Sequence, residues 1–297
     1  MTILELMSKD LNLDIDFIKS IANKNNLYKK FKIKKRNGKD RIIYHPSKEL
    51  KLLQYWLVRN IFSKFPISKY STAFSKGNSI KKNALIHRNS NYILHMDIKN
   101  FFESIKYFHI DSLLDKISEI DNEDRNLIKN IVLYEGENLV VGSVSAPIIA
   151  NCLMYEIDLD IYNTCVKDRD LIYTRYADDI IISSKNYIDK NIVDDIKLLL
   201  EKRQFEINDK KTFFMNRKGR RTITGITIDN NNNNLSLGSK RYKKIKNMIY
   251  KYLLKNEGNK EILLGYLAYI KDIDENKYKK IKENYKVYDK NNELFKA

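Results

Sequence analysis

Tyr176-Ala177-Asp178-Asp179 places two adjacent carboxylates between two apolar segments, Leu171-Ile172-Tyr173 and Ile180-Ile181-Ile182. β-Branched and aromatic residues on both sides of turn-forming residues predict a tight hairpin over 171–183. Two neighbouring anions are unfavourable in a buried turn unless a cation shares the site. Mg²⁺ suits such a turn because it takes oxygen ligands and keeps positions for water and substrate phosphates. The alternative is an ordinary solvated turn, in which aspartate is common.

A third carboxylate favours the metal interpretation. The segment 91–98 is predicted to be a strand, and Asp97 lies at its end. If Asp97 lies beside Asp178 and Asp179, the three carboxylates form a set suited to two Mg²⁺ ions about 3.5–4 Å apart. Such a pair activates a hydroxyl nucleophile and neutralises a leaving pyrophosphate. Phosphoryl transfer depends mainly on this positioning and charge neutralisation.

The composition indicates a polyanionic partner. The chain has 297 residues and a formal net charge of +17, with 55 Lys and Arg against 38 Asp and Glu. It also has 20 Tyr and 12 Phe, which provide faces on which unpaired bases stack. Basic and aromatic residues together favour single-stranded or looped RNA, although dispersed lysines also occur as an ordinary solvated surface.

The two cysteines, Cys152 and Cys165, imply no disulfide framework and fit a reducing cytoplasm. The first residues lack the basic and apolar regions of a signal peptide. No stretch approaches the roughly 18 apolar residues of a membrane span. We therefore expect a cytoplasmic protein that has no contact with a membrane.

Periodicity predicts helices interleaved with strands, which is an α+β fold. Asn37-Gly38 is a strong signal for a hairpin over 32–44, and Ser47 is a plausible cap for the helix that follows. The other predicted helices lie in 1–30, within 68–90, near 109–120 and 122–134, over 145–165, near 189–203 and after 234. The other predicted strands are 204–208 and 222–228, with a polar turn at 230–234.

The motifs in their order resemble those of reverse transcriptases, from about Lys30 to about Ile270. Two stretches resemble the bacterial retron reverse transcriptases in particular. They are Asn83-Ala84-Leu85-Ile86-His87 and Ile223-Thr224-Gly225. The other matching stretches are Lys39 to Ser47 with Glu49-Leu50-Lys51, Asp97 with Phe101-Phe102, Gly142 to Pro147 with Asn151, Arg175 to Asp179, and Asn208 with Lys211-Thr212. The template-side motif departs from the family, which usually has Gln where this chain has Val141.

The resemblance implies a right-hand polymerase fold with an antiparallel palm sheet and a helical thumb. Residues 1–90 would form the fingers with the N-terminal helices. Residues 91–233 would form the palm, with a finger-like helical insertion at about 109–140, and residues 234–297 would form the thumb.

The resemblance also implies roles for individual residues. Asp97, Asp178 and Asp179, with the backbone carbonyl of Ile98, would hold two Mg²⁺ ions. Phe102, five residues after Asp97, stands where the family has the ring that excludes a ribose 2′-hydroxyl, with a core phenylalanine as the alternative. Lys211 would protonate the leaving pyrophosphate, or would be a surface lysine.

Other residues are expected at the nucleotide. Lys35 and Arg41 flank the Asn37-Gly38 turn and would project onto the triphosphate, where Arg offers a bidentate fork. Gly142, Pro147 and Ala177 are small or helix-initiating residues that would let a nucleotide approach closely. Ordinary helix initiation explains Pro147 nearly as well.

A third group is expected at RNA. Asn83 and His87 are four residues apart and would share one helix face, either for RNA or for a core hydrogen bond. Thr224 and Gly225 would bring the backbone near RNA or form a strand bulge. The thumb lysines would contact phosphates of structured RNA; they are Lys240, Lys243, Lys244 and Lys246.

We therefore expect an RNA-directed DNA polymerase that uses dNTPs. As the retron resemblance implies, a structured non-coding RNA would be template and primer, and the product would be branched multicopy single-stranded DNA (msDNA). A role in anti-phage defence beside a separate effector protein would follow. The alternatives are a reverse transcriptase of group II intron or diversity-generating type, and a scaffold that holds RNA–DNA and sequesters an effector.

Overall fold

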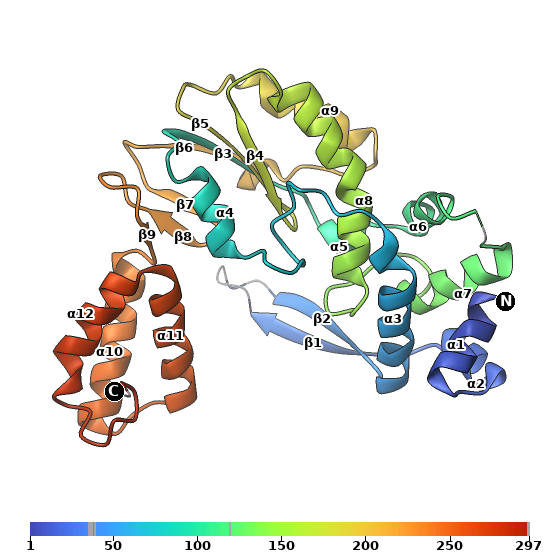
Figure 1. Ribbon diagram of the computed structural model, residues 1–297, viewed down its shortest axis with the longest axis horizontal. Coiled ribbons are helices and arrows are strands. Elements are labelled where there is room, and N and C mark those ends of the chain that lie inside the picture. The colour runs from blue at the N-terminus through green and yellow to red at the C-terminus, as the bar shows by residue number, and fades with distance from the viewer. Residues whose placement is uncertain (35–37, 39, 119, 296–297) are drawn as a thin grey trace. The chain divides into compact units, whose positions relative to one another are not determined.

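The computed structural model describes residues 1–34, 38, 40–118 and 120–295. In this part of the chain, helices are interleaved with strands, as the predicted α+β class requires (Figure 1). Two compact units are present. Unit 1 comprises Met1–Lys76, Met96–Ile180 and Asp189–Thr212, and unit 2 comprises Gly77–His95, Ile181–Ile188 and Phe213–Ala297. Each unit gathers segments that are distant in the sequence.

The first helices of unit 1 begin at side chains that accept backbone hydrogen bonds, which satisfies amides that have no partner within the helix. Thr2 and Glu5 form a capping box, and Asp14 caps the second helix. The predicted cap at Ser47 is confirmed, because its hydroxyl accepts a hydrogen bond from the Leu50 amide at 3.2 Å. The helices are α1 (Ile3–Leu11), α2 (Ile15–Ala22) and α3 (Lys48–Asn60), and the 3₁₀ helix η1 (Phe62–Lys64) follows.

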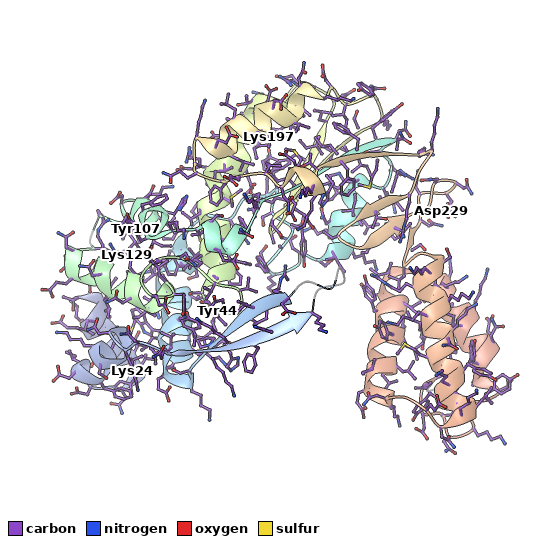
Figure 2. All side chains as sticks on the ribbon, turned by 180° about the vertical axis from the view of Figure 1, so that it is seen from behind. Lys24, Tyr44, Tyr107, Lys129, Lys197 and Asp229 are labelled. Carbon is purple, nitrogen blue, oxygen red and sulfur yellow. The ribbon has the colours of Figure 1, made fainter. Side chains whose placement is uncertain are left out.

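The predicted N-terminal hairpin is confirmed on both sides of its turn. Strands β1 (Tyr28–Lys34) and β2 (Asp40–Pro46) pair antiparallel, from Tyr28 opposite Pro46 to Lys34 opposite Asp40. Tyr44 of β2, labelled in Figure 2, donates its backbone amide to the Val141 carbonyl at 2.8 Å. This bond attaches the hairpin to the segment that precedes α8 (Ala146–Ile161).

The rest of unit 1 is built around α8, whose apolar residues surround the helix and are therefore buried. Ile149, Met154 and Ile161 are fully buried. The other helices of this unit are α5 (Phe101–Ser104), α6 (Tyr107–Leu114), α7 (Asn122–Val132), the π-helical turn η2 (Tyr162–Val166), α9 (Asn191–Glu201) and the 3₁₀ helix η3 (Asp209–Lys211).

The strands that carry the acidic residues belong to one sheet, in the order β4-β5-β3-β6. Strands β3 and β6 pair antiparallel, from Tyr92 opposite Asn216 to His95 opposite Phe213. The predicted hairpin at 171–183 is confirmed as β4 followed by β5. The bounds are β3 (Tyr92–Asp97), β4 (Ile172–Tyr176), β5 (Asp179–Ser184) and β6 (Phe213–Asn216).

Unit 2 has its own apolar core. It joins residues of a small sheet, among them Ile226, to residues of the C-terminal helices, among them Ile245 and Leu267. The C-terminal helices lie side by side, in orange to red in Figure 1. The elements are α4 (Ile80–His87), β7 (Arg221–Ile223), β8 (Ile226–Ile228), β9 (Leu235–Ser236), α10 (Ser239–Lys255), α11 (Lys260–Ile273) and α12 (Glu275–Lys286).

Two predicted strands are wrong in detail. Residues 204–208 form no strand and contribute one isolated bridge, Ile98 with Ile207, whereas the strand β6 begins later at Phe213. Residues 222–228 form two short strands, because Thr224 and Gly225 both have positive φ angles, 44° and 83°, and reverse the chain. Thr224-Gly225 is therefore a two-residue hairpin turn and not a bulge.

The polar segment 230–234 connects β8 to β9, as the sequence predicted for a hairpin tip. No helix among the described residues combines the length and the apolar character that are needed to cross a membrane.

Candidate active site

The acidic turn lies beside the end of β3. Strand β4 ends at Tyr176 and β5 begins at Asp179, so Ala177 and Asp178 form the turn, with Ala177 at a φ of 54°. The backbone amide of Ile98 donates to the Asp178 carbonyl at 2.9 Å. This bond brings Asp97, the last residue of β3, next to the turn, although the two segments are 80 residues apart in the chain.

The carboxylates of this site influence one another. Burial, together with the negative charges of Asp179 and Asp97, raises the pKa of the Asp178 carboxyl to about 6. Like charges close together disfavour ionisation, and a bound cation would reverse that effect. Asp97 itself is buried, at 4 % exposure. The turn is therefore a region of concentrated negative charge.

Lys211 is the cation that contacts this group. Its Nζ lies 2.7 Å from Oδ2 of Asp97, and the Asn208 amide side chain donates to Oδ1 of the same carboxylate at 3.4 Å. The Asn208 backbone amide also donates to the Asp97 carbonyl at 2.8 Å. The Lys211 side chain is 56 % exposed, against 5 % for Asp97. The structure thus brings together Asp97, Asp178 and Lys211, all named from the sequence.

The donor chemistry of the site fits divalent cations. Among the described residues, no three Asp, Glu, His or Cys side chains are gathered into a preformed ligand cluster. The oxygen atoms at the turn are those that Mg²⁺ prefers. The raised pKa of Asp178 shows that further positive charge would stabilise the ionised form of this carboxyl.

A second ion pair, which the sequence analysis did not single out, lies behind the turn. Arg175 and Asp158 are both fully buried, and Nε of Arg175 lies 2.8 Å from Oδ1 of Asp158. Nη1 of Arg175 also donates to the carbonyl of Ala177 in the acidic turn, at 3.2 Å. Tyr173 donates its hydroxyl to Asp158 at 2.6 Å. Helix α8 therefore supports the turn from inside the protein through one guanidinium group.

Phe101 and Phe102 lie in the short helix α5, which follows the strand that ends at Asp97. Their side chains therefore point in different directions because of the helical geometry and not because of alternation along a strand. Phe101 is buried, as predicted, with its ring 6.3 Å from that of Phe205. Phe102 is half-buried, and its ring centroid lies 6.2 Å from that of Phe74. The ring of Phe102 is thus held on one side by another aromatic ring, near the end of β3.

The other residues expected at the nucleotide lie on the hairpin and at the start of α8. Arg41 is exposed on β2 opposite Ile33, and Lys35 lies outside the described residues. Gly142 has a φ of 107°, and a Cβ atom there would lie 2.3 Å from the Tyr44 carbonyl oxygen. The absence of a side chain at Gly142 therefore allows the hairpin to pack closely. Pro147 is in the first turn of α8.

In unit 2, Asn83 and His87 share the buried face of α4, as the spacing of four predicted, and both have no exposed surface. Nδ1 of His87 lies 2.7 Å from the Ser183 hydroxyl. Burial lowers the pKa of His87 to about 3. The contact of His87 favours its alternative as a core hydrogen-bonding residue, and full burial of both side chains argues against their contact with RNA. The hydroxyl of Thr224 donates to the Ile80 carbonyl at 3.4 Å.

A basic groove of about 1080 Å³ lies between the strands β8 and β9 and the helices α10 and α12. Lys240, Lys243 and Lys246 line it, whereas Lys244 does not. The sequence analysis missed four further cations of this groove, because tertiary structure alone unites them with α10; they are Lys218, Arg220, Lys277 and Lys280.

Comparison with known proteins agrees with this geometry. Residues 33–228 match the family model described as reverse transcriptase (RNA-dependent DNA polymerase). The Escherichia coli retron Ec73 reverse transcriptase is 36% identical over 275 residues, covering 86% of each chain. The Escherichia coli retron Ec86 reverse transcriptase is 29% identical over 259 residues, covering 86% of this chain and 79% of that relative.

The chain belongs to the retron reverse transcriptases. A retron reverse transcriptase is an RNA-directed DNA polymerase, so this protein is a nucleotidyltransferase that copies an RNA template into DNA. Enzymes with this domain use divalent metal ions, which agrees with the acidic turn.

Solved structures confirm the right-hand polymerase fold predicted for this retron reverse transcriptase. Telomerase from Candida albicans, solved with a fragment of telomeric RNA, is similar with a TM-score of 0.50 and 15% identity. The match covers 91% of this chain and 55% of that one. Telomerase from Candida tropicalis also gives a TM-score of 0.50, at 13% identity, over 88% of this chain and 57% of that one.

Proposed function

We propose that this enzyme synthesises branched, RNA-linked msDNA from a structured non-coding RNA. The observation that carries the chemical part is the juxtaposition of Asp97 and Asp178, joined by the hydrogen bond between Ile98 and Asp178 at 2.9 Å. The family membership carries the biological part. The RNA would serve as the template and would supply the priming 2′-hydroxyl group of a guanosine.

Asp97, Asp178, Asp179 and the Ile98 carbonyl would hold two Mg²⁺ ions. Bound there, the ions would activate the attacking hydroxyl and neutralise charge on the leaving pyrophosphate. Lys211, 2.7 Å from Asp97 and more than half exposed, would donate a proton to the pyrophosphate. Asn208 would hold the Asp97 carboxylate in place through the hydrogen bond described above.

The nucleotide would be bound by residues around this turn. The half-buried ring of Phe102 would lie against the sugar and select deoxynucleotides. Arg41, with Lys35 on the same hairpin, would bind the triphosphate of the dNTP. Gly142, Pro147 and Ala177 would shape the surface against which the base pair lies.

The basic groove of unit 2 would bind phosphates of the non-coding RNA. Its cations surround a concave surface, and phosphate contacts determine the position of a protein on a nucleic acid. Thr224 and Gly225, on the tight turn between β7 and β8, and the lysines Lys240, Lys243 and Lys244 would belong to this RNA-binding face.

We also propose a division of the chain into polymerase lobes, a cellular location and a biological role. Residues 1–90 would be the fingers, 91–233 the palm with its insertion at about 109–140, and 234–297 the thumb. The enzyme would act in the cytoplasm, in anti-phage defence, with its msDNA product bound and a separate effector protein as a partner.

A primer-extension assay tests the chemistry. The purified protein, the non-coding RNA from its genomic neighbourhood, dNTPs and Mg²⁺ are expected to yield DNA whose 5′ end is released by a debranching enzyme. Asp178→Ala is expected to abolish the product, whereas Asp16→Ala, at an exposed position on α2, is the matched control. Equal activity of wild type and Asp178→Ala would contradict the assignment of the site. DNA without a 2′–5′ branch would contradict the msDNA assignment.

A binding assay tests the groove. Lys243→Gln removes a cation that lines it, and Lys255→Gln removes an exposed cation at the C-terminal end of α10 that does not. The first variant is expected to weaken binding of the non-coding RNA. Measured over a series of salt concentrations, the slope of the logarithm of the binding constant against the logarithm of salt concentration should fall by about 1, the loss of one phosphate contact. An equal effect of the two substitutions would refute a specific role of the groove.

A further inference from the structure

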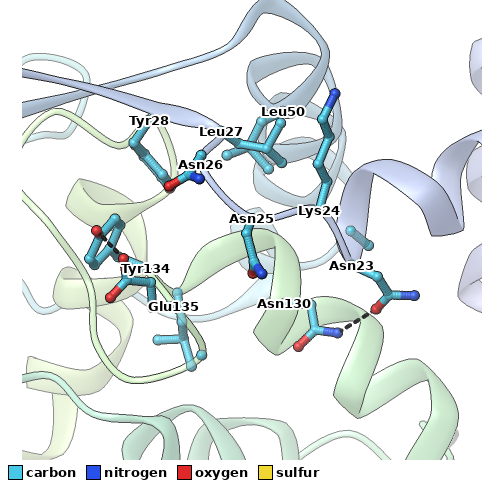
Figure 3. A pocket seen from close by; sticks show the side chains of 13 residues that line it. Asn23, Lys24, Asn25, Asn26, Leu27, Tyr28, Leu50, Asn130, Tyr134 and Glu135 are labelled. Carbon is cyan, nitrogen blue, oxygen red and sulfur yellow. Dashed lines mark hydrogen bonds between the residues drawn. The ribbon is translucent and has the colours of Figure 1, made fainter.

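A second cavity, of about 290 Å³, lies in unit 1, away from the residues assigned to catalysis. Its wall comprises the end of α2 with the loop that follows, the start of β1, one residue of α3, Asn130 of α7 and the turn that follows α7 (Figure 3). A volume of this size is near the lower limit for small-molecule sites, so it admits one ring system and not an extended segment.

The rim of this cavity is rich in amide groups. Asn25 and Asn26 lie in the loop, and Asn130 on α7 donates to Oδ1 of Asn23 at 3.0 Å. In Figure 3 the Asn25 side chain projects from the loop into the pocket. Within the described part of the chain, no hydrogen bond engages the side-chain amides of Asn25 or Asn26. An amide presents a donor and an acceptor side by side, which complements the edge of a nucleobase.

Part of the cavity wall is apolar or aromatic. Leu50 and Leu133 are buried beneath it, at 2% exposure each. The rings of Tyr28 and Tyr134 meet edge to face with centroids 5.6 Å apart, and both residues line the cavity. Aromatic rings beside amide groups are the chemistry by which unpaired bases are bound.

The charges around the cavity suit a base that is attached to phosphates. Lys24 lies at the rim, and Nζ of Lys30 lies 5.0 Å from the ring centroid of Tyr134. The acidic residue of the lining, Glu135, accepts a hydrogen bond from the Tyr134 hydroxyl. The lining thus holds one cation, Lys24, and one anion, Glu135, and has no net formal charge, which disfavours a free phosphate as the occupant.

We propose that this amide pocket, formed by Asn25, Asn26, Asn130, Tyr28 and Tyr134, binds one unpaired nucleobase of a bound nucleic-acid strand. The proposal rests on the proposed function, which supplies the strand. Adenine is the best match, because an asparagine amide pairs with its N6 and N7 atoms. The pocket would give the finger region a contact that reads a base, whereas the groove of unit 2 contacts phosphates.

Fluorescence anisotropy of the full-length protein tests this pocket. The probes are labelled rA6, rU6 and dA6, with unlabelled AMP as a competitor. rA6 is expected to bind more tightly than rU6, and Asn25→Ala with Asn130→Ala is expected to weaken binding of rA6 by about 5- to 150-fold and that of rU6 much less. Asn126→Ala, an exposed asparagine one turn earlier on α7, is the matched control and is expected to change nothing.

Several outcomes decide the proposal. A comparable loss of affinity for rA6 and dA6 in the pocket variant supports a pocket that binds a base of RNA or of DNA. A loss of affinity for rA6 alone supports a pocket that binds a base of RNA. Unchanged rA6 binding in a pocket variant that unfolds at the wild-type temperature overturns it. Displacement of rA6 by AMP at equal molar concentration also overturns it, since the site would then serve free nucleotides.

A second readout separates this proposal from the proposed function. Photocrosslinking of 8-azidoadenosine within rA6 is expected to label a peptide that contains Tyr28 or Tyr134, and labelling confined to other peptides overturns the pocket. If wild type makes no branched DNA but the pocket variants lose rA6 binding, the msDNA assignment fails and the pocket stands. The converse result refutes the pocket alone.

Discussion

Two aspartate–cation pairs lie next to the acidic turn, one behind it and one in front. Their nitrogen–oxygen distances are similar, but the solvent exposure of their side chains differs. Behind the turn, Arg175 and Asp158 lie 2.8 Å apart and both side chains have 0% exposure. At the front, Lys211 and Asp97 lie 2.7 Å apart, with 56% and 5% exposure. The same type of contact therefore exists once with both side chains buried and once with a buried aspartate and an exposed lysine.

This difference separates structural from chemical roles. Removal of one member of a buried pair leaves an uncompensated charge in a medium that solvates it poorly. Both members of the rear pair are therefore needed for the stability of the folded state. An exposed lysine is solvated with or without its partner, and the buried Asp97 carboxylate keeps the Asn208 amide as a donor, so loss of the lysine should cost little stability. Lys211 can therefore leave the carboxylate and return to it at small cost, which a proton donor requires.

The largest expected effect is the loss of activity when the Asp178 carboxylate of the acidic turn is replaced by a neutral group. We expect Asp178→Asn to reduce primer extension by at least about 10³-fold, since metal ions contribute several kcal/mol of charge stabilisation. Thermal unfolding should occur at the same or a higher temperature, because Asn removes a carboxylate whose pKa burial and two like charges raise. Retention of activity, or strong destabilisation, would break the comparison.

Loss of the rear pair should have the opposite profile. We expect Asp158→Ala to lower the free energy of unfolding by about 3–5 kcal/mol, measured by urea denaturation, because Arg175 would remain buried without its partner. Glu156→Gln is the matched control on the same helix. Glu156 pairs with Lys116 at a half-exposed position, so the control should cost less than about 1 kcal/mol. Similar costs for both variants would contradict the argument.

Substitution of the exposed lysine should reduce activity without affecting stability. We expect Lys211→Met to reduce the rate of nucleotide addition by about 10²-fold, within the range for loss of a general acid. The free energy of unfolding should change by less than about 1 kcal/mol. Single-turnover kinetics and urea denaturation of the same sample give both values. A large loss of stability would assign Lys211 to the fold.

The smallest expected effect concerns a buried group outside the turn. Burial lowers the pKa of His87 to about 3, below its usual value of 6.5. Between these values the unfolded chain binds a proton that the folded chain does not, so stability is complete above about pH 6.5 and falls as the pH is lowered. One proton gives a slope of at most about 1.4 kcal/mol per pH unit.

The measurement is urea denaturation at several pH values between 7 and 5. His87→Gln should flatten the pH dependence relative to wild type, even if the variant is less stable at every pH. Parallel pH profiles of the two proteins would show that His87 is not the group responsible.

Much of the fold follows from local pattern. The cap at Ser47, the pairing of β1 with β2 and the turn at 230–234 involve residues close together in the sequence, so their positions were predictable. The stretch 204–208 was misassigned, because a short apolar segment is compatible with a strand or with an extended loop. For Thr224-Gly225 the sequence left open an approach of the backbone to RNA or a strand bulge, because two adjacent residues with positive φ are recognisable only when the pairing of the flanking strands is known.

The site shows the same division. Asp97 and Asp178 could be named from the sequence because the acids interrupt apolar strands. The role of Arg175 was not predicted, since its partner Asp158 is 17 residues away on another element and charged residues are usually exposed. The cations Lys218 and Lys277 are far apart in the chain, and no sequence pattern unites them in one groove.

By itself, the sequence determined the helices and most strands, the two carboxylate-bearing segments and membership in the retron reverse transcriptases. These depend on residue type, spacing and local backbone preference. The tertiary structure decided which charge pair is buried and which is exposed, that His87 faces a core hydroxyl, and which lysines share a groove with residues outside α10. Burial and long-range contact set these properties, because the free energy of a charge depends on its surroundings and not on its place in the chain.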